Sequence, residues 1–378
     1  MASLPGLAMP LCIAAFALGL PAAHVLTNLS CVLFGAGQVR FENRPAPAIQ
    51  DPNDILIRIS YVGVCGSDVH QWVHGGTEAA RITPEAPLVM GHEASGIVHS
   101  VGPSVTRLKP GDRVVIEPGY SCRRCRHCKA GRYNICAGMR FAADPPTDGT
   151  LACFFRIPHD FAYRIPDALS LQEAVLVEPL SVAVHVARLA GVTAGQTVLV
   201  QGSGTIGLLA AATALAFGAR AVLIADINEA KLGFARGFID CFAFVSDPAS
   251  PPRLEAERLR REAGVEHIDV VLECTGVESS IQTGFYALGP GGTFVQIGMG
   301  KPLVNLPLLD TCEKEMVLKV SFRYGPGDFE TALGLLETRK LSLKPLISNV
   351  VPFEKAAEAW EMTRRGEGIK NIIQGVQD

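Results

Sequence analysis

The sequence predicts an α/β protein with two domains, one rich in β-strands and one built on a doubly wound parallel sheet. The chain has 378 residues, which is more than one compact core usually holds and enough for two. Short β-rich runs separated by glycine and proline fill residues 29–166, whereas apolar strands alternate with helical spacing from about Leu171 onward. A glycine-rich turn joins a strand to a helix in this second region.

The β-rich region is expected to contain many turns and few helices. Its clearest strand candidates are the runs ILIRISYVGV, GIVHSVG and DRVVIEPG, at residues 55–64, 96–102 and 112–119.

The second region carries the pattern of a parallel sheet that is covered by helices on both faces. Its expected strands are Thr197–Gln201, Ala221–Ala225, Ile268–Glu273 and Thr293–Ile297. The tail carries two amphipathic helical stretches, residues 330–340 and 355–365, and a short strand at 369–375. We expect this tail to pack back on the first domain.

These patterns divide the chain into three parts. Residues 1–26 include the apolar run LCIAAFALGL, which no Lys or Arg precedes and which is too short to span a bilayer. We therefore expect a disordered N-terminal extension of a cytoplasmic protein and no membrane association. Residues 27–180 and 324–378 are assigned to the first domain, and residues 181–323 to the second.

Composition limits the class of partner. Lys and Arg total 34 and Asp and Glu total 37, a net charge of -3, so the chain lacks the basic field that nucleic-acid binding usually needs. A small soluble substrate is expected instead. Of the 11 cysteines, four lie between residues 122 and 136. In a chain of this length they favour metal binding over disulfides.

The glycine-rich turn predicts a dinucleotide site of the Rossmann type. Gly202, Gly204 and Gly207 form a G-x-G-x-x-G pattern with a strand before it and an apolar helix after it. Asp226 ends the next strand, where a carboxylate accepts from the adenosine ribose hydroxyls and repels the extra phosphate of NADP. The cofactor is therefore expected to be NAD.

Four cysteines predict a structural zinc site. Cys122, Cys125, Cys128 and Cys136 place four soft donors in a fifteen-residue loop, as a tetrahedral Zn²⁺ requires. The basic residues between them indicate an exposed loop, and His127 is interpreted as a surface residue.

A second, dispersed group predicts a catalytic zinc. Cys65 lies in G-V-C-G-S-D, His92 and Glu93 in G-H-E, and Glu178 in V-E-P-L. Together they offer one thiolate, one imidazole and carboxylates, which suits a zinc that keeps a position open for substrate.

In this order, these motifs resemble the zinc-containing medium-chain alcohol and polyol dehydrogenases, from Leu29 to the C-terminus. The E-P-L motif is similar to that of the sorbitol and xylitol branch. The stretches EPGYSCRRC, MRFAADPP and SFRYG resemble fungal xylitol dehydrogenases more closely than animal sorbitol dehydrogenases. The resemblance implies a GroES-like catalytic domain beside a Rossmann domain, one catalytic and one structural zinc, and a homodimer or homotetramer.

The resemblance also implies residue roles. Cys65, His92 and Glu93 would bind zinc, and Glu178 would either hold the metal-bound water or exchange with Glu93, an alternative that the sequence leaves open. Ser67 would take the alcohol proton and pass it on to His70. Arg323 and Tyr324 would contact substrate hydroxyls, and Phe141 would line the pocket. Besides the three glycines and Asp226, the implied cofactor contacts are Thr205, Ile206, Lys231, Ile297, Gly298, Met299, Ser321, Phe322 and Arg323.

The expected reaction is the oxidation of xylitol to D-xylulose, with zinc lowering the pKa of the secondary alcohol and hydride passing to NAD. The alternatives are a sorbitol/L-iditol or L-arabinitol dehydrogenase and, outside enzymes, a catalytically inactive crystallin-like binding protein. The chain departs from the family at Gln71, where an aromatic residue is usual, and in residues 76–81, which lack an apolar loop. Both departures lie near the expected substrate entrance.

Overall fold

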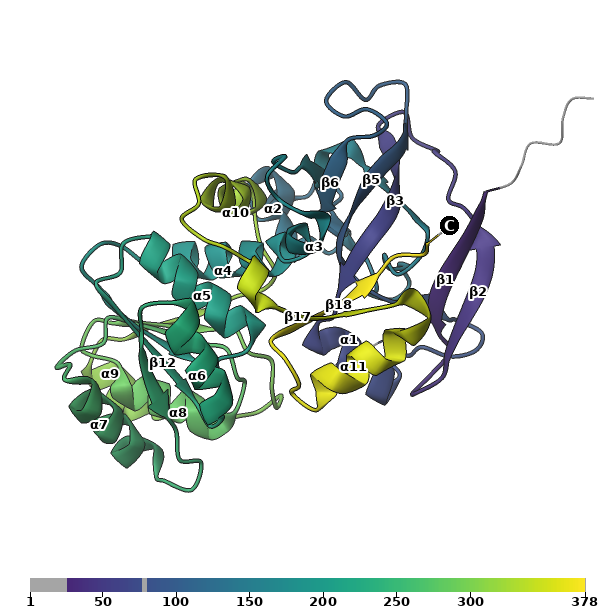
Figure 1. The fold of residues 1–378 in the computed structure, drawn as a ribbon. Helices are drawn as coiled ribbons and strands as arrows, with labels where there is room; N and C mark the ends of the chain where they lie inside the picture. Colours follow the sequence, from purple (N-terminus) through teal and green to yellow (C-terminus); the bar gives the residue numbers. More distant parts are fainter. Residues whose placement is uncertain (1–25, 77–79, 378) are drawn as a thin grey trace, which may run out of the picture.

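The computed structural model describes residues 26–76 and 80–377, and shows two sheet-based halves side by side (Figure 1). The predicted N-terminal extension lies outside the described residues except for Leu26, as does the centre of the divergent segment at 76–81. No helix within the described part of the chain is long and apolar enough to cross a membrane.

The β-rich half is organised around a seven-stranded sheet. Its strand order is β10-β6-β5-β3-β18-β17, with β9 also paired to β3. The strands are β3 (Asp54–Gly63), β5 (Glu93–Val101), β6 (Arg113–Ile116), β9 (Phe154–Pro158), β10 (Ala162–Arg164), β17 (Ile347–Val351) and β18 (Lys370–Gln374). The last two belong to the tail, and β18 runs antiparallel to β3. The C-terminal segment is therefore part of the first sheet.

Smaller elements surround this sheet. A three-stranded sheet, β2-β1-β4, lies at one side, and a two-stranded ribbon, β7-β8, leads into and out of the cysteine loop. Their bounds, with those of the helices of this half, are β1 (Thr27–Leu33), β2 (Val39–Pro45), β4 (Leu88–Val89), β7 (Gly119–Tyr120), β8 (Arg140–Phe141), α1 (Gly66–His74), α2 (Arg126–Lys129), α3 (Leu171–Ala174), α10 (Asp328–Glu337) and α11 (Ala356–Arg364).

The other half is a six-stranded, wholly parallel sheet in the order β13-β12-β11-β14-β15-β16. This is the doubly wound arrangement whose strand order reverses between its first and fourth strands, and ligands bind beyond the carboxyl ends of the strands at that point. Its elements are β11 (Thr197–Gln201), α5 (Thr205–Ala216), β12 (Ala221–Asp226), α6 (Glu229–Phe238), β13 (Phe242–Val245), α7 (Pro252–Ala263), β14 (Val270–Glu273), α8 (Glu278–Ala287), β15 (Thr293–Gln296), α9 (Leu308–Glu313) and β16 (Val317–Val320).

Helix α4 (Val177–Ala190) connects the halves. One apolar cluster includes Leu180 and Val184 of this helix together with Val200 of β11, Leu208 of α5 and Phe329 of α10. The fold therefore ties the start of α4, which carries Glu178, to both sheets.

The expected elements are present, with some differences in extent and number. The strand expected from Ile268 begins at Val270, and the strands β13, β16 and β17 were not predicted. These strands are only four or five residues long and show no clean period-2 pattern, so the sequence gives little warning of them. The β-rich region also contains a nine-residue helix, α1.

Candidate active site and zinc centres

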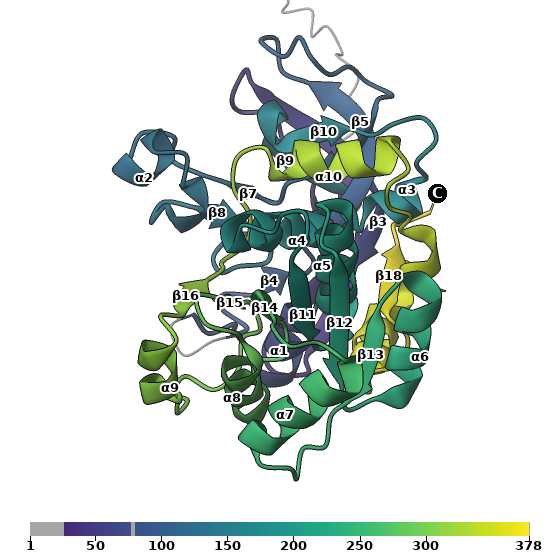
Figure 2. The same ribbon diagram turned by 90° about the vertical axis from the view of Figure 1, so that its left-hand side faces the viewer.

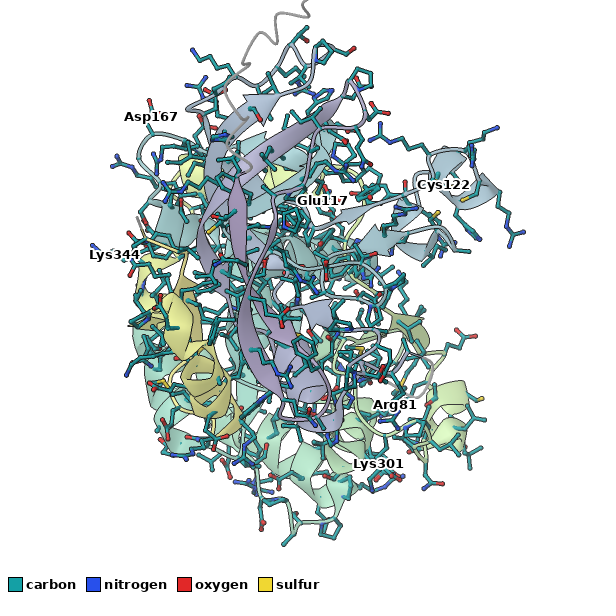
Figure 3. The ribbon with its side chains drawn as sticks, turned by 90° about the vertical axis from the view of Figure 1, so that its right-hand side faces the viewer. Arg81, Glu117, Cys122, Asp167, Lys301 and Lys344 are labelled. Carbon is teal, nitrogen blue, oxygen red and sulfur yellow. The ribbon has the colours of Figure 1, made fainter. Side chains whose placement is uncertain are left out.

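The four lobe cysteines converge in a projecting loop. Figure 2 shows α2 standing away from the body of the molecule, and Figure 3 shows Cys122 in this projection. Four of the distances between Sγ atoms are 3.4, 3.5, 3.8 and 3.9 Å. Four sulfurs at about 2.3 Å from a tetrahedral zinc would lie about 3.8 Å apart, so the set fits this ion. Backbone N–H groups of Arg124 and Cys125 lower the pKa of Cys122 to about 6, which favours the thiolate.

The dispersed group also converges. Ligand atoms of Cys65, His92 and Glu93 all lie within 4.8 Å of one another. The register of β3 against β5 explains this, because Gly63 pairs with Glu93 and so brings the chain after β3 beside the G-H-E motif. A Cβ at Gly63 would lie only 2.2 Å from Glu93 Oε2, so the close approach requires glycine there. One thiolate, one imidazole and one carboxylate are a donor set that suits zinc.

Asp68 supports two members of this group. One of its carboxylate oxygens accepts the backbone N–H of Cys65 at 2.9 Å, and the other lies 3.4 Å from His92 Nδ1. Burial lowers the pKa of His92, but the Asp68 carboxylate more than offsets this and raises it well above the usual value. Asp68 thus holds Nδ1, so that Nε2 could bind a metal, and carboxylates commonly orient zinc-binding histidines in this way.

A buried lysine pairs with the carboxylate of the group. Lys370 Nζ forms an ion pair with Glu93, both side chains being 2% exposed, and donates to the carbonyl of Val64 at 2.9 Å. Burial lowers the pKa of Lys370, and the Glu93 charge more than restores it. An unpaired charge would be costly at this depth, and the ion pair offsets that cost for both side chains.

Glu178 is not a member of the cluster of three donors, but its carboxylate lies near enough for the charges of Glu93 and His92 to act on it. Burial raises its pKa to about 7, and the nearby Glu93 charge adds to the effect. The Tyr324 hydroxyl lies beside this carboxylate, and the ring is 2% exposed. Glu178 and Tyr324 thus form a second polar layer next to the three donors.

The glycine-rich turn has the geometry that its residues require. Gly202 has a φ of 95°, a left-handed conformation that favours glycine. A Cβ on Gly207 would lie 1.8 Å from the carbonyl oxygen of Gly202, so helix α5 can pack on the turn only without a side chain there. Gly204 has no atom near its missing Cβ, which leaves the backbone open for close approach. Thr205 Oγ1 donates to the carbonyl of Ile369 at 2.7 Å, joining the turn to the tail.

One cavity joins this turn to the donor group. It has a volume of about 240 Å³ and is lined by Cys65 and Glu93 on one side and by Gly204–Gly207 on the other, with Lys231 and Lys370 nearby. The two sets of residues therefore face a common space.

A second cavity, of about 370 Å³, lies beyond the carboxyl ends of β11 and β12 and is lined by Asp226 and Ile227. Asp226 Oδ2 accepts the N–H of Ser203 at 2.6 Å and its hydroxyl at 2.8 Å, and Oδ1 accepts the N–H of Asn228 at 2.9 Å. The carboxylate is thus anchored to the glycine-rich turn itself.

The remaining residues expected at the site lie in different parts of the fold. Ser67 and His70 share helix α1, but among the described residues no hydrogen bond joins them, and the exposed His70 ring packs on His74 at 4.6 Å. Ile297 and Gly298 follow β15 and pack closely on the backbone after β14.

Exposure also varies among the expected cofactor contacts. Met299 is 82% exposed and Phe322 is 46% exposed, whereas Ser321 Oγ is buried and has no hydrogen-bond partner among the described residues. Phe141 is buried, with its ring centroid 5.7 Å from that of His92, and the Arg323 guanidinium lies over it at 3.7 Å.

Two residues of the site were missed from the sequence. Asp68 lies inside the quoted G-V-C-G-S-D motif, and its place three residues after a candidate ligand at a helix start was the available signal. Lys370 had no local signal, because its contact with Val64 spans 306 positions of the chain.

Comparison with known proteins gives consistent matches. Residues 51–167 match the model of the alcohol dehydrogenase GroES-like domain, and residues 205–338 match that of the zinc-binding dehydrogenase domain.

Two curated relatives illustrate the likeness. A protein of Aspergillus fumigatus named probable D-xylulose reductase A is 48% identical over 353 residues, which cover 93% of this chain and 98% of the relative. D-xylulose reductase A of Aspergillus niger is 46% identical over 351 residues, covering 92% and 97%. Among solved structures, galactitol-1-phosphate dehydrogenase from Escherichia coli superposes with a TM-score of 0.82 at 29% identity, covering 92% of this chain and 99% of that one.

Proposed function

This chain belongs to the zinc-containing medium-chain alcohol dehydrogenase family, and from that membership we propose that it oxidises xylitol to D-xylulose with NAD. The proposal is supported by the names of the fungal relatives, which match nearly the whole chain. The expected fold class, a GroES-like domain with a Rossmann domain, is confirmed by the two matching family models and by the parallel sheet.

The observation that carries the proposal is the cavity shared by the donor group and the glycine-rich turn. Cys65 and Glu93 line one wall and Gly204–Gly207 another, within about 240 Å³. Hydride transfer requires the reacting alcohol and the cofactor to be held in contact, and a common cavity provides for this. A protein that only bound NAD would not need three clustered metal donors there.

Cys65, His92 and Glu93 would hold the catalytic zinc. When bound, zinc supplies Lewis acidity that lowers the pKa of the substrate's secondary alcohol. We assign Glu93 as the third donor because its carboxylate clusters with the other two, and Glu178 as the neighbouring carboxylate outside the donor set. The four lobe cysteines would hold a structural zinc, because their spacing fits a closed tetrahedral site.

Ser67 and His70 remain our candidates for proton removal. Ser67 lies two residues after Cys65, and His70 is exposed on the same helix, so a proton received there can pass to solvent. Arg323 and Tyr324 would bind hydroxyl groups of the substrate, and Phe141 would form the apolar wall.

We propose that residues 27–180 and 324–378 form the catalytic domain and residues 181–323 the NAD domain. The tail strands β17 and β18 pair within the first sheet, which supports including the tail there. We also propose a cytoplasmic location, which suits lobe cysteines that form no disulfide among the described residues.

We propose that the protein forms a homodimer, or a homotetramer that contains this dimer, through the edge strand β16. Val320 is 72% exposed on this strand, and Leu308 and Leu309 of α9 are 66% and 72% exposed. An apolar edge strand is a template on which another strand can pair, and a second copy offers an identical one. Light scattering should give at least twice the mass of the chain, and Val320→Lys should shift it toward the monomer.

The function is tested with a panel of polyols and both cofactors. Xylitol with NAD should give the highest kcat/KM, and zinc analysis should find two ions per chain. A preference for sorbitol or L-arabinitol would replace the substrate and keep the chemistry. NADH binding without turnover of any polyol would support the crystallin-like alternative and refute the proposal.

A further inference from the structure

The Arg323 side chain is held close to the catalytic donor group. Its guanidinium stacks on Phe141 at 3.7 Å, and Phe141 in turn packs on the zinc-donor candidate His92. The side chain is 18% exposed. Arginine has five N–H donors in a rigid fork, and here one of its terminal nitrogens has a protein acceptor among the described residues. The other donors remain for hydroxyl groups of a substrate.

That one acceptor is Asp144. Its Oδ2 accepts from Arg323 Nη2 at 2.9 Å. Asp144 is 53% exposed, whereas Arg323 is largely enclosed, so the carboxylate fixes the outer edge of the guanidinium.

The backbone on both sides of this pair is constrained. Arg323 and Ala143 each have a φ of 57°, a left-handed conformation that is unfavourable for residues with a side chain. A side-chain amide anchors each segment: Gln71 donates to the carbonyl of Ala143 at 2.8 Å, and Asn134 donates to the carbonyl of Phe322 at 2.8 Å. Such strain persists only where surrounding contacts enforce it, and it gathers at functional sites.

These contacts explain the departure at Gln71. The Gln71 amide donates to the carbonyl of Ala143, which the ring of a phenylalanine could not do, and so secures the segment that carries Asp144. Helix α1 therefore anchors the segment that carries Asp144, and the cysteine lobe anchors the segment that carries Arg323. Two separate elements thus hold the members of this ion pair in position.

We propose that Asp144 is a positioning residue that orients Arg323 for binding the hydroxyl groups of the polyol. The inference rests on the proposed function and adds a residue to its substrate site. Without the carboxylate the guanidinium could leave Phe141 for solvent, and ordering it again would weaken substrate binding. Because Arg323 would contact hydroxyls away from the reacting carbon, its disorder should raise KM and leave kcat nearly unchanged.

The test compares Asp144→Asn with a matched variant in the same loop, Asp148→Asn. Asp148 pairs with Arg44 at 3.0 Å and is also 53% exposed, and among the described residues no hydrogen bond or ion pair joins this pair to Arg323. Its other oxygen accepts the N–H of Val89 at 2.9 Å, and asparagine can retain that bond. Both variants lose one half-exposed carboxylate, so any general effect of charge or stability is shared.

For Asp144→Asn we expect KM for xylitol to rise about tenfold, equivalent to about 1.4 kcal/mol, with kcat within about twofold of wild type. Asp144→Glu should recover most of the loss because it restores an acceptor for Arg323. Asp148→Asn should match the wild type in both KM for xylitol and kcat.

Equal constants for Asp144→Asn and Asp148→Asn, in an enzyme that oxidises polyols, would refute the role of Asp144 alone. A fall in kcat with unchanged KM would also refute it, since it would assign the residue to chemistry. A wild type that is inactive on every polyol would refute the proposed function and this inference with it.

Discussion

Replacing Asp226 by asparagine removes a negative charge at the end of β12 and retains an oxygen acceptor. The oxygen matters because Oδ2 accepts both the N–H and the hydroxyl of Ser203, which is fully buried. Alanine would leave that buried N–H unpaired, at a cost of about 1–3 kcal/mol in stability, and would confound the cofactor effect. Asparagine removes the charge but keeps an acceptor for Ser203, so a change in cofactor preference can be attributed to the charge.

The expected size of the cofactor preference follows from the charges of the Asp226 carboxylate and of the extra phosphate of NADP. Two unit charges 4 Å apart interact by about 4 kcal/mol at an effective dielectric constant of 20, and NADP carries a dianionic phosphate near this carboxylate. Solvent reaches the partly exposed Asp226 and screens part of this repulsion. We therefore expect the wild type to prefer NAD by at least about a hundredfold, or about 2.8 kcal/mol. Asp226→Asn should reduce the preference by about tenfold or more.

An arginine at position 227 should then recruit the phosphate. Ile227 is 67% exposed beside the same cavity, so a longer side chain has room, and a guanidinium can pair with phosphate in bidentate fashion. The assay is kcat/KM for NAD and NADP with the wild type, Asp226→Asn and Asp226→Asn/Ile227→Arg. Glu229→Gln, three residues further on at the start of α6, controls for a general change in charge. Equal use of NADP by the wild type would overturn the assignment of Asp226.

Three further outcomes follow from the site and the lobe. Cys65→Ala or His92→Ala should reduce turnover to below about a thousandth of wild type, because several kcal/mol of charge stabilisation are lost. A fluorescence titration should show that NADH binding is nearly unchanged. Near-native activity would disprove the catalytic zinc. Cys125→Ser should remove about one zinc ion per chain and lower the melting temperature by about 5 °C or more, since structural zinc contributes directly to folding. Cys312→Ser, at an exposed free cysteine, is the control. Equal zinc content in the two variants would contradict a structural site. Burial raises the pKa of Glu117 to about 7, so its contribution to stability is complete below about pH 4.5 and is lost as the pH rises through 7. Glu117→Gln should thus become more stable relative to wild type by up to about 3 kcal/mol between pH 5 and 8 in urea unfolding, and a difference that does not vary with pH would refute this.

The carboxyl group of Glu117 also shows how the lobe is joined to the sheet. Tyr133 of the lobe donates to one oxygen at 2.5 Å, and Tyr163 of β10 donates to the other at 2.8 Å. In Figure 3 Glu117 lies on the body of the molecule and Cys122 on the projection. Nothing in the local sequence around Glu117 indicates this contact, because its two partners lie 16 and 46 positions away.

The sequence by itself determined the features that depend on short spacings. The G-x-G-x-x-G turn with its flanking strand and helix, the acidic end of β12 and the four cysteines of the lobe could be predicted because each is built from residues close together in the chain. The order of motifs indicated the family for the same reason. The identity of the dispersed donors Cys65, His92 and Glu93 could be proposed from that order, but not their distances.

Only the tertiary structure decided how distant residues meet. The register of β3 on β5 places Cys65 beside Glu93, and the pairing of β18 with β3 brings Lys370 to the same carboxylate. The approach of Arg323 to Asp144 likewise joins segments 179 positions apart. Strand register and chain return depend on the packing of the whole core, and a local sequence pattern carries no record of that packing.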